Sequence, residues 1–176
     1  REKEELKKDI ERMVEELKKL NKESRDRTRK LIKELEDLVK ESDDDTERLA
    51  RKLEKEVKDD EDLLRKVKKI IDELKKSNED VERTVRTIAE DLKRSNDEDH
   101  RRIEEIIRRI EKLLREGGDR VEDLLREARK LIEELKRHTE EVIKRNKKLI
   151  DELKEIIEDV IRRNRKLVKE LEDTAK

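Results

Sequence analysis

Two histidines and a few aspartates are the side chains of this sequence best suited to chemistry. Asp97 and His100 lie three residues apart, a spacing that places both on one face of a helix. Together with Asp60, Asp99 and His138 they could supply nitrogen and oxygen ligands to zinc or iron. The Glu-x-x-His pattern of di-iron helical bundles is nevertheless absent. We therefore expect no metal and no other cofactor.

Nothing else in the sequence indicates catalysis. The chain contains no cysteine, and its only two glycines are the adjacent pair Gly117 and Gly118. A glycine-rich phosphate loop, a nucleophile elbow and a Cys-His pair are therefore all missing. We expect a protein that is not an enzyme and has no small-molecule substrate. The lack of cysteine leaves the redox compartment undetermined.

Charge is abundant but balanced. Asp, Glu, Lys and Arg make up 60% of the chain, with 52 basic and 53 acidic residues. Basic clusters at 25–30 and 162–166 include polar or acidic residues and no aromatic residue that could stack on a base, so we expect no nucleic-acid partner. No apolar run approaches the ~20 residues that span a bilayer, and no targeting or secretory segment is apparent. We expect a soluble protein with no membrane partner and unknown localisation.

Leu, Ile and Val recur every three or four residues, which is typical of helices with one apolar face. The pattern predicts helices at about 2–41, 46–76, 80–116 and 120–175 in a single domain, 1–176. Short connections favour antiparallel neighbours. The predicted fold is all-α, an antiparallel up-down-up-down four-helix bundle or coiled coil with an over-long C-terminal helix.

The predicted breaks rest on polar residues that compete for backbone hydrogen bonds. They lie at Glu41–Thr46, Ser77–Asp80 and Gly117–Asp119, whereas Ser95–Asp97 is expected to remain helical despite a similar composition. An alternative is that the helix runs through Asn78 and the molecule becomes a longer, domain-swapped rod.

Polar residues interrupt the apolar faces of the predicted helices. Folding the chain at the predicted breaks brings Ser24, Asp60, Asn96 and His138 to nearly the same level. Burying such groups costs about 1–3 kcal/mol each unless they are hydrogen-bonded. We therefore expect a polar layer that fixes helix register, although chance levelling remains the alternative. Its expected members are Asn21, Ser24, Thr28, Asp60, Ser95, Asn96, Asp99, His100, His138 and Thr139.

These features resemble computationally designed (de novo) helical bundles with buried hydrogen-bond networks. The resemblance covers the whole chain and rests on the Ser-Asp-Asp-Asp, Ser-Asn-Glu-Asp and Glu-Gly-Gly-Asp connections, the Glu/Lys/Arg-rich surface and the gathered polar residues. It implies a non-natural structural scaffold or self-assembling bundle. Members usually have helices of matched length, and the predicted last helix departs from that pattern.

Residues 157–176 are expected to project beyond the bundle, because the predicted last helix is longer than the others. Their apolar face continues, so association through it is favoured over fraying. The expected partners are a second copy of the chain or a designed partner helix. The predicted association stripe comprises Asn146, Ile157, Val160, Ile161, Asn164, Val168 and Leu171. The alternative functions are a helix-capturing binding module and a conformational switch in which acid charges His100 and His138 and loosens the bundle.

Overall fold

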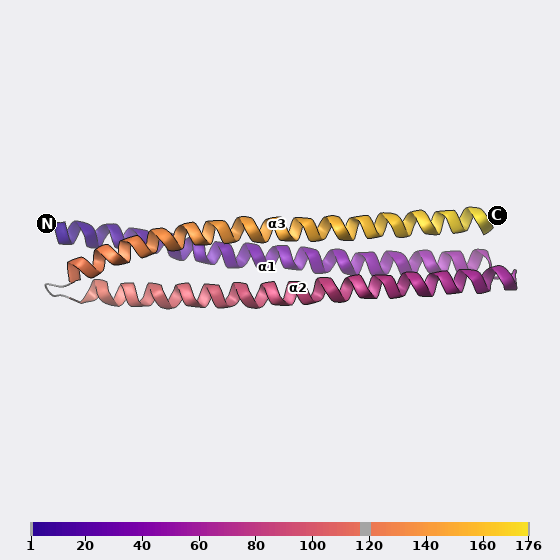
Figure 1. Cartoon of the computed structure of the whole chain (residues 1–176), viewed down its shortest axis with the longest axis horizontal. Coiled ribbons are helices and arrows are strands. Elements are labelled where there is room, and N and C mark those ends of the chain that lie inside the picture. The colour runs from indigo at the N-terminus through magenta and orange to yellow at the C-terminus, as the bar shows by residue number, and fades with distance from the viewer. Residues whose placement is uncertain (1, 117–120, 176) are drawn as a thin grey trace. The chain divides into compact units, whose positions relative to one another are not determined.

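The computed structural model describes residues 2–116 and 121–175, and it contains three long helices (Figure 1). They are α1 (Glu2–Glu56), α2 (Glu61–Arg115) and α3 (Val121–Ala175), each of 55 residues. No strand occurs in these described ranges. The prediction of an all-α fold is confirmed, whereas the four predicted helices are replaced by three.

The chain forms two compact units, and each contains a segment of all three helices. Unit 1 comprises the described residues of Arg1–Leu31 and Asp91–Lys148. Unit 2 comprises those of Ile32–Glu90 and Leu149–Lys176.

Apolar side chains at helical spacing form a separate core in each unit. The core of unit 1 includes Ile10 and Leu17 of α1, Ile103 of α2, and Leu125 and Ile132 of α3, all at most 2% exposed. In unit 2 the fully buried Leu53 of α1 packs with Ile71 of α2 and Val168 of α3.

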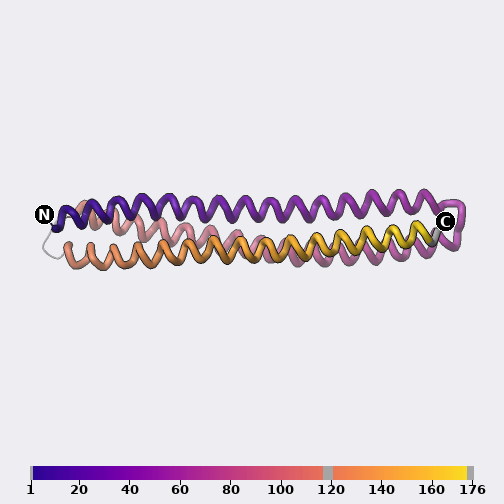
Figure 2. The backbone as a smooth tube through the Cα atoms, turned by 90° about the horizontal axis from the view of Figure 1, so that it is seen from above, coloured from indigo at the N-terminus to yellow at the C-terminus, as the bar shows by residue number. Residues whose placement is uncertain are grey.

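Within unit 2, α2 runs antiparallel to α1, and the end of α3 lies beside the connection between them (Figure 2). Ion pairs from Glu34 to Lys154 and from Asp45 to Arg165 show that α3 runs in the same direction as α1. Each helix of unit 2 therefore contacts the other two.

The predicted break at Glu41–Thr46 is wrong, because α1 continues through it. The Thr46 hydroxyl donates to the Ser42 carbonyl one turn earlier, at 3.0 Å, so it does not cap a new helix. Asp45 contacts Arg48 and Arg165 instead of ending the helix. Side-chain partners inside the bundle outweigh the local preference of these residues for a turn.

The predicted break at Ser77–Asp80 is also wrong, and α2 runs through Asn78 as the alternative interpretation had it. The Asn78 side chain bonds to α1 and α3, so it is not available to end a helix. Helical continuity through Ser95–Asp97 is confirmed.

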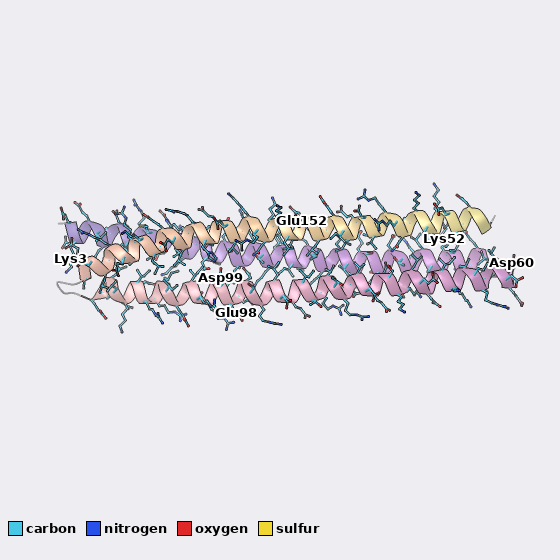
Figure 3. All side chains as sticks on the ribbon, viewed as in Figure 1. Lys3, Lys52, Asp60, Glu98, Asp99 and Glu152 are labelled. Carbon is cyan, nitrogen blue, oxygen red and sulfur yellow. The ribbon has the colours of Figure 1, made fainter. Side chains whose placement is uncertain are left out.

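The chain reverses between Glu56 and Glu61, where the sequence had predicted continuous helix. Asp60 begins α2: its carboxylate accepts a hydrogen bond from the Leu63 amide at 3.2 Å. Figure 3 places Asp60 at this connection. Glu61 and Asp62 in the first turn add favourable charge near the helix N-terminus.

The break predicted at Gly117–Asp119 lies outside the described residues. On either side of it, α2 ends at Arg115 and α3 begins at Val121.

The predicted projection of 157–176 is wrong for the described part of α3. Ile157, Asn164 and Val168 are at most 8% exposed within unit 2. The first three predicted helices are in fact two, with one chain reversal in place of two. This makes α1 and α2 as long as α3, so this segment has partners along its length.

Candidate functional site

A polar layer crosses unit 2 and joins its three helices by side-chain hydrogen bonds. Asn78 of α2 donates to the Thr46 hydroxyl of α1 at 2.8 Å, and it accepts from the Asn164 amide of α3 at 2.7 Å. The same Thr46 hydroxyl donates to the Ser42 carbonyl. These four residues are each 6–8% exposed, so the bonds lie within the bundle.

A second polar layer lies in unit 1. Asn146 of α3 donates to the Thr28 hydroxyl of α1 at 3.1 Å, and Asn96 of α2 donates to the Arg25 carbonyl of α1 at 3.3 Å. Ser24 and Thr139 are also buried, and the Thr139 hydroxyl donates to the Leu135 carbonyl. Among the described residues, no buried side-chain nitrogen or oxygen lacks a hydrogen-bond partner.

His100 extends the layer of unit 1 toward the surface between α1 and α2. Asn21 donates to the His100 carbonyl at 3.1 Å, and the His100 Nδ1 lies 3.3 Å from the Asn21 carbonyl oxygen. Its Nε2 lies 3.1 Å from the Arg25 guanidinium and 2.9 Å from a Glu104 carboxylate oxygen. A proton on Nδ1 lets the ring donate to the Asn21 carbonyl and accept from Arg25 at Nε2, whereas a hydrogen bond from Nε2 to Glu104 requires a proton on Nε2.

Six of the ten predicted layer residues are buried in unit 1. They are Asn21, Ser24, Thr28, Asn96, His100 and Thr139.

Four other predicted layer residues are not buried there. Asp60 belongs to unit 2 and caps α2, and Ser95 is exposed. The His138 side chain is 48% exposed and lies 3.3 Å from Asp99, which is itself 33% exposed. Figure 3 shows Asp99 on the side of α2 that faces the other helices and Glu98 on the opposite side. The prediction that Asp60 and His138 belong to one polar layer is wrong, because it assumed chain reversals at positions where the helices continue.

Sequence reasoning missed the layer of unit 2 because it assigned Ser42, Thr46 and Asn78 to breaks. A repeat of 18 residues would have found them. It relates Ser24 to Ser42, Thr28 to Thr46, Asn78 to Asn96, and Asn146 to Asn164. Eighteen residues make about five helical turns, so the paired positions share a face of their helix.

The predicted association stripe is mostly inside the bundle. Asn146, Ile157, Asn164 and Val168 are buried, and Val160, Ile161 and Leu171 are half-buried. The exposed large apolar side chains lie on a neighbouring flank of α3, namely Leu124, Leu131, Leu149, Ile156 and Leu167.

A pair of carboxyl groups lies beside the polar layer of unit 2, between α1 and α2. Burial raises the pKa of Asp43 to about 7, and a hydrogen bond and charge repulsion from Glu82 add to the effect. One proton shared by the two carboxyl groups relieves the repulsion between them. A group that titrates near neutral pH thus adjoins the layer.

Two ion pairs between α1 and α3 lower the pKa of their carboxyl groups, whereas the pKa of Asp43 is raised. Asp45 has a side chain only 10% exposed, and its hydrogen bond to Arg165 at 2.9 Å lowers the pKa of that carboxyl. In unit 1, a hydrogen bond from Lys136 likewise lowers the pKa of Glu16.

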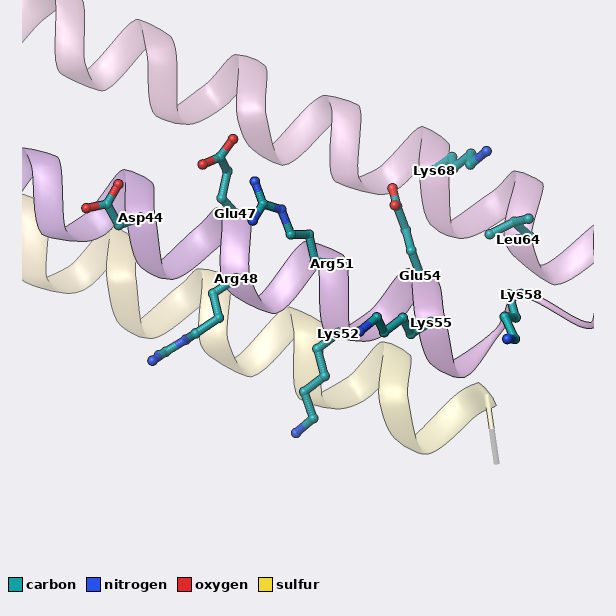
Figure 4. A pocket seen from close by; sticks show the side chains of 10 residues that line it. All are labelled: Asp44, Glu47, Arg48, Arg51, Lys52, Glu54, Lys55, Lys58, Leu64 and Lys68. Atoms are coloured by element: carbon teal, nitrogen blue, oxygen red, sulfur yellow. The ribbon is translucent and has the colours of Figure 1, made fainter.

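An open groove of about 830 Å³ in unit 2 has a basic lining (Figure 4). Leu64 and Lys68 contribute from α2, and the remaining lining residues come from α1 and the connection that follows it. Six of its ten lining residues are Lys or Arg, three are Asp or Glu, and none is His, Ser or Thr. We interpret the groove as solvated surface, because charged side chains make up nine of its ten lining residues.

No metal site is apparent in the described ranges, where no three His, Cys, Asp or Glu side chains are grouped to bind an ion. The described helices also lack a segment long and apolar enough to cross a membrane. Comparison with protein-family models, with curated proteins and with solved structures found no match. The site therefore has to be interpreted from its own geometry: two polar layers that connect packed helices.

Proposed function

We propose that this protein is a structural scaffold, a non-natural helical bundle able to self-assemble, whose helix register is specified by its polar layers. The observation that carries the proposal is the chain of bonds in unit 2 from Asn164 through Asn78 to Thr46. It connects three helices through the side chains of Asn and Thr.

Specificity is the physical reason for such a layer. An apolar helical core can shift by a turn at little cost, because Leu and Ile pack against one another in many arrangements. A shift that separates Asn78 from Thr46 and Asn164 leaves buried donors and acceptors unpaired, at about 1–3 kcal/mol for each group. The native register is therefore favoured over its neighbours, even where the layer adds little to total stability.

A cross-linking experiment tests this role. Asp45→Cys with Arg165→Cys reports the native register, since these side chains are in contact. Asp45→Cys with Glu158→Cys reports α3 displaced by about two turns. We expect the native pair alone to form a disulfide while the layers are intact.

The same two reporters are then placed in a chain whose layers are apolar, with Thr46→Val, Asn78→Leu and Asn164→Leu in unit 2 and Thr28→Val, Asn96→Leu and Asn146→Leu in unit 1. We expect both disulfides to form in that background. Retention of the native disulfide alone would refute the role in register, and unchanged helicity by circular dichroism serves as the folding control.

A pH-responsive switch is the second candidate, favoured by the Asp43–Glu82 pair. Since the pKa of Asp43 is raised to about 7, the folded state holds a proton there that the unfolded state, with an ordinary Asp pKa, has already lost. The layer region of unit 2 is then stabilised at mildly acidic pH and loosened as pH rises through about 7. This direction is opposite to the loosening in acid expected from the histidines. Helicity measured from pH 5 to 9 tests it, with Asp43→Asn as the control.

A further inference from the structure

The described part of α3 has an exposed apolar flank in unit 2. Leu149 and Leu167 are each 36% exposed, and Ile156 is 52% exposed, the highest fraction among the exposed large apolar side chains of the described residues. All three lie within a narrow strip of the helix surface, at intervals of seven and eleven residues. Grouped exposure of this kind is typical of a surface that binds another protein.

The flank lies on the side of α3 that faces α2. Three ion pairs tie the other side of α3 to α1, from Lys154 to Glu34, Arg165 to Asp45 and Glu172 to Lys52. Toward α2, Val160 and Val81 line a small cavity together. Val81 is half-buried, as is Ile88 two turns later on the same face of α2. The apolar strip of α3 is thus widened by half-buried residues of α2.

Residues of α3 are arranged symmetrically about position 158, so two antiparallel copies of this helix can place matching residues opposite one another. Leu149 and Leu167 lie nine residues on either side of position 158, and Ile156 and Val160 lie two residues on either side of it. Glu152 lies six residues before position 158, and Arg163 lies five residues after it. Both charges border the apolar strip on the side away from α2, at helical positions about 20° apart.

We propose that a second copy of this chain docks on this flank, with its α3 antiparallel to the first and a twofold axis near residue 158. Leu149 then packs against Leu167 of the second copy, and Ile156 of each copy lies close to the axis. Glu152 faces Arg163 of the second copy, and the symmetric arrangement makes that ion pair twice. A parallel pairing would instead place the charged border of each α3 on opposite sides of the interface, where Glu152 and Arg163 of the two copies could not meet, so the charge pattern favours the antiparallel arrangement.

This inference deepens the proposed function, because the dimer would be the self-assembled form of the scaffold. The two remain separable: register is read within one chain, and docking is read from the mass of the assembly. A chain that keeps its native-register disulfide and stays monomeric would overturn the docking and leave the scaffold intact.

Sedimentation equilibrium from about 1 to about 200 µM, a range suited to the affinity of a small interface, tests whether the dimer forms. We expect a dimer in the full chain and a monomer of unchanged helicity after Leu149→Glu with Ile156→Glu. A monomeric full chain would overturn the proposal, and so would a dimer that survives the double substitution.

Charge reversal tests the pairing of Glu152 with Arg163. Glu152→Arg alone should weaken the dimer by roughly tenfold, since two ion pairs become two repulsions, and Glu152→Arg with Arg163→Glu should restore it. Glu134→Arg, the same change 18 residues earlier in unit 1, is the matched control and should leave the dimer unaffected. A loss that the second reversal does not restore would contradict this pairing.

Single cysteines test the orientation without interference, because the chain has none of its own. A mixture of Leu149→Cys and Leu167→Cys chains should form the mixed disulfide, identified by mass. Disulfides that join two Leu149→Cys chains or two Leu167→Cys chains would indicate a parallel pair and overturn the proposed axis.

Discussion

Asn78 is the residue whose removal should disturb the polar layer of unit 2 most. Its side chain both donates to Thr46, at 2.8 Å, and accepts from Asn164, at 2.7 Å. Asn78→Ala leaves the Asn164 amide, in a residue 8% exposed, without its acceptor and opens a small cavity. An unpaired buried amide costs about 1–3 kcal/mol. With the cavity included, we expect a loss of about 3 kcal/mol in the free energy of unfolding.

The matched control is Asn96→Ala in unit 1. Asn96 makes a longer bond, 3.3 Å, to a single backbone carbonyl, that of Arg25. A backbone carbonyl at a helix surface retains its own intrahelical bond, so its loss of a second donor is cheaper. We expect a cost of about 1 kcal/mol, well below that of Asn78→Ala.

Urea unfolding followed by circular dichroism measures both costs. Because the two units can unfold in separate steps, native-state hydrogen exchange of the amides in unit 2 is measured as well. A double-mutant cycle of Asn78→Ala with Asn164→Ala should give a coupling of about 1 kcal/mol. Equal costs for Asn78→Ala and Asn96→Ala, or additivity in the cycle, would refute the reasoning.

Three further predictions follow from the contacts. Because the pKa of Asp43 is raised to about 7, the free energy of unfolding of the wild type should fall as pH rises from 4 to 8. Solvent screening of this partly exposed pair limits the fall to about 1 kcal/mol. Urea unfolding of Asp43→Asn should show no such fall. Because Arg165 lowers the pKa of Asp45, Arg165→Ala should reduce stability at pH 7, and the loss should shrink as acid protonates the carboxylate. An equal loss at pH 7 and in strong acid, measured by urea unfolding, would contradict the ion pair. Leu53→Ala should cost about 3 kcal/mol in thermal or urea unfolding because Leu53 is fully buried, and a cost below about 1 kcal/mol would contradict that burial.

The layers explain why the sequence predicted some positions well and others poorly. Asn21, Ser24, Thr28 and Asn96 interrupt long apolar runs, and a polar residue at such a position must point inward. Their burial followed from periodicity. The histidines were less predictable: His100 is buried, but His138 lies at the edge of the apolar face of α3, and about half of its side chain is exposed.

Residues at the predicted breaks were assigned wrongly because local chemistry allows two outcomes for them. Thr46 and Asn78 can cap a helix or bond across a bundle, and each outcome is worth about 1 kcal/mol. The choice depends on whether a partner arrives from a segment more than thirty residues away. Asp60, at the true reversal, was interpreted as inward-facing although it caps α2.

The sequence by itself determined that this protein is helical, that each helix has one apolar face and that polar residues interrupt those faces. These are local properties, set by the spacing of Leu, Ile and Val and by the absence of proline. Only the tertiary structure decided where the chain reverses, which polar residues meet, and which flank of α3 stays uncovered. Those outcomes depend on distant segments, since Asn164 acquires a partner only when α2 brings Asn78 beside it.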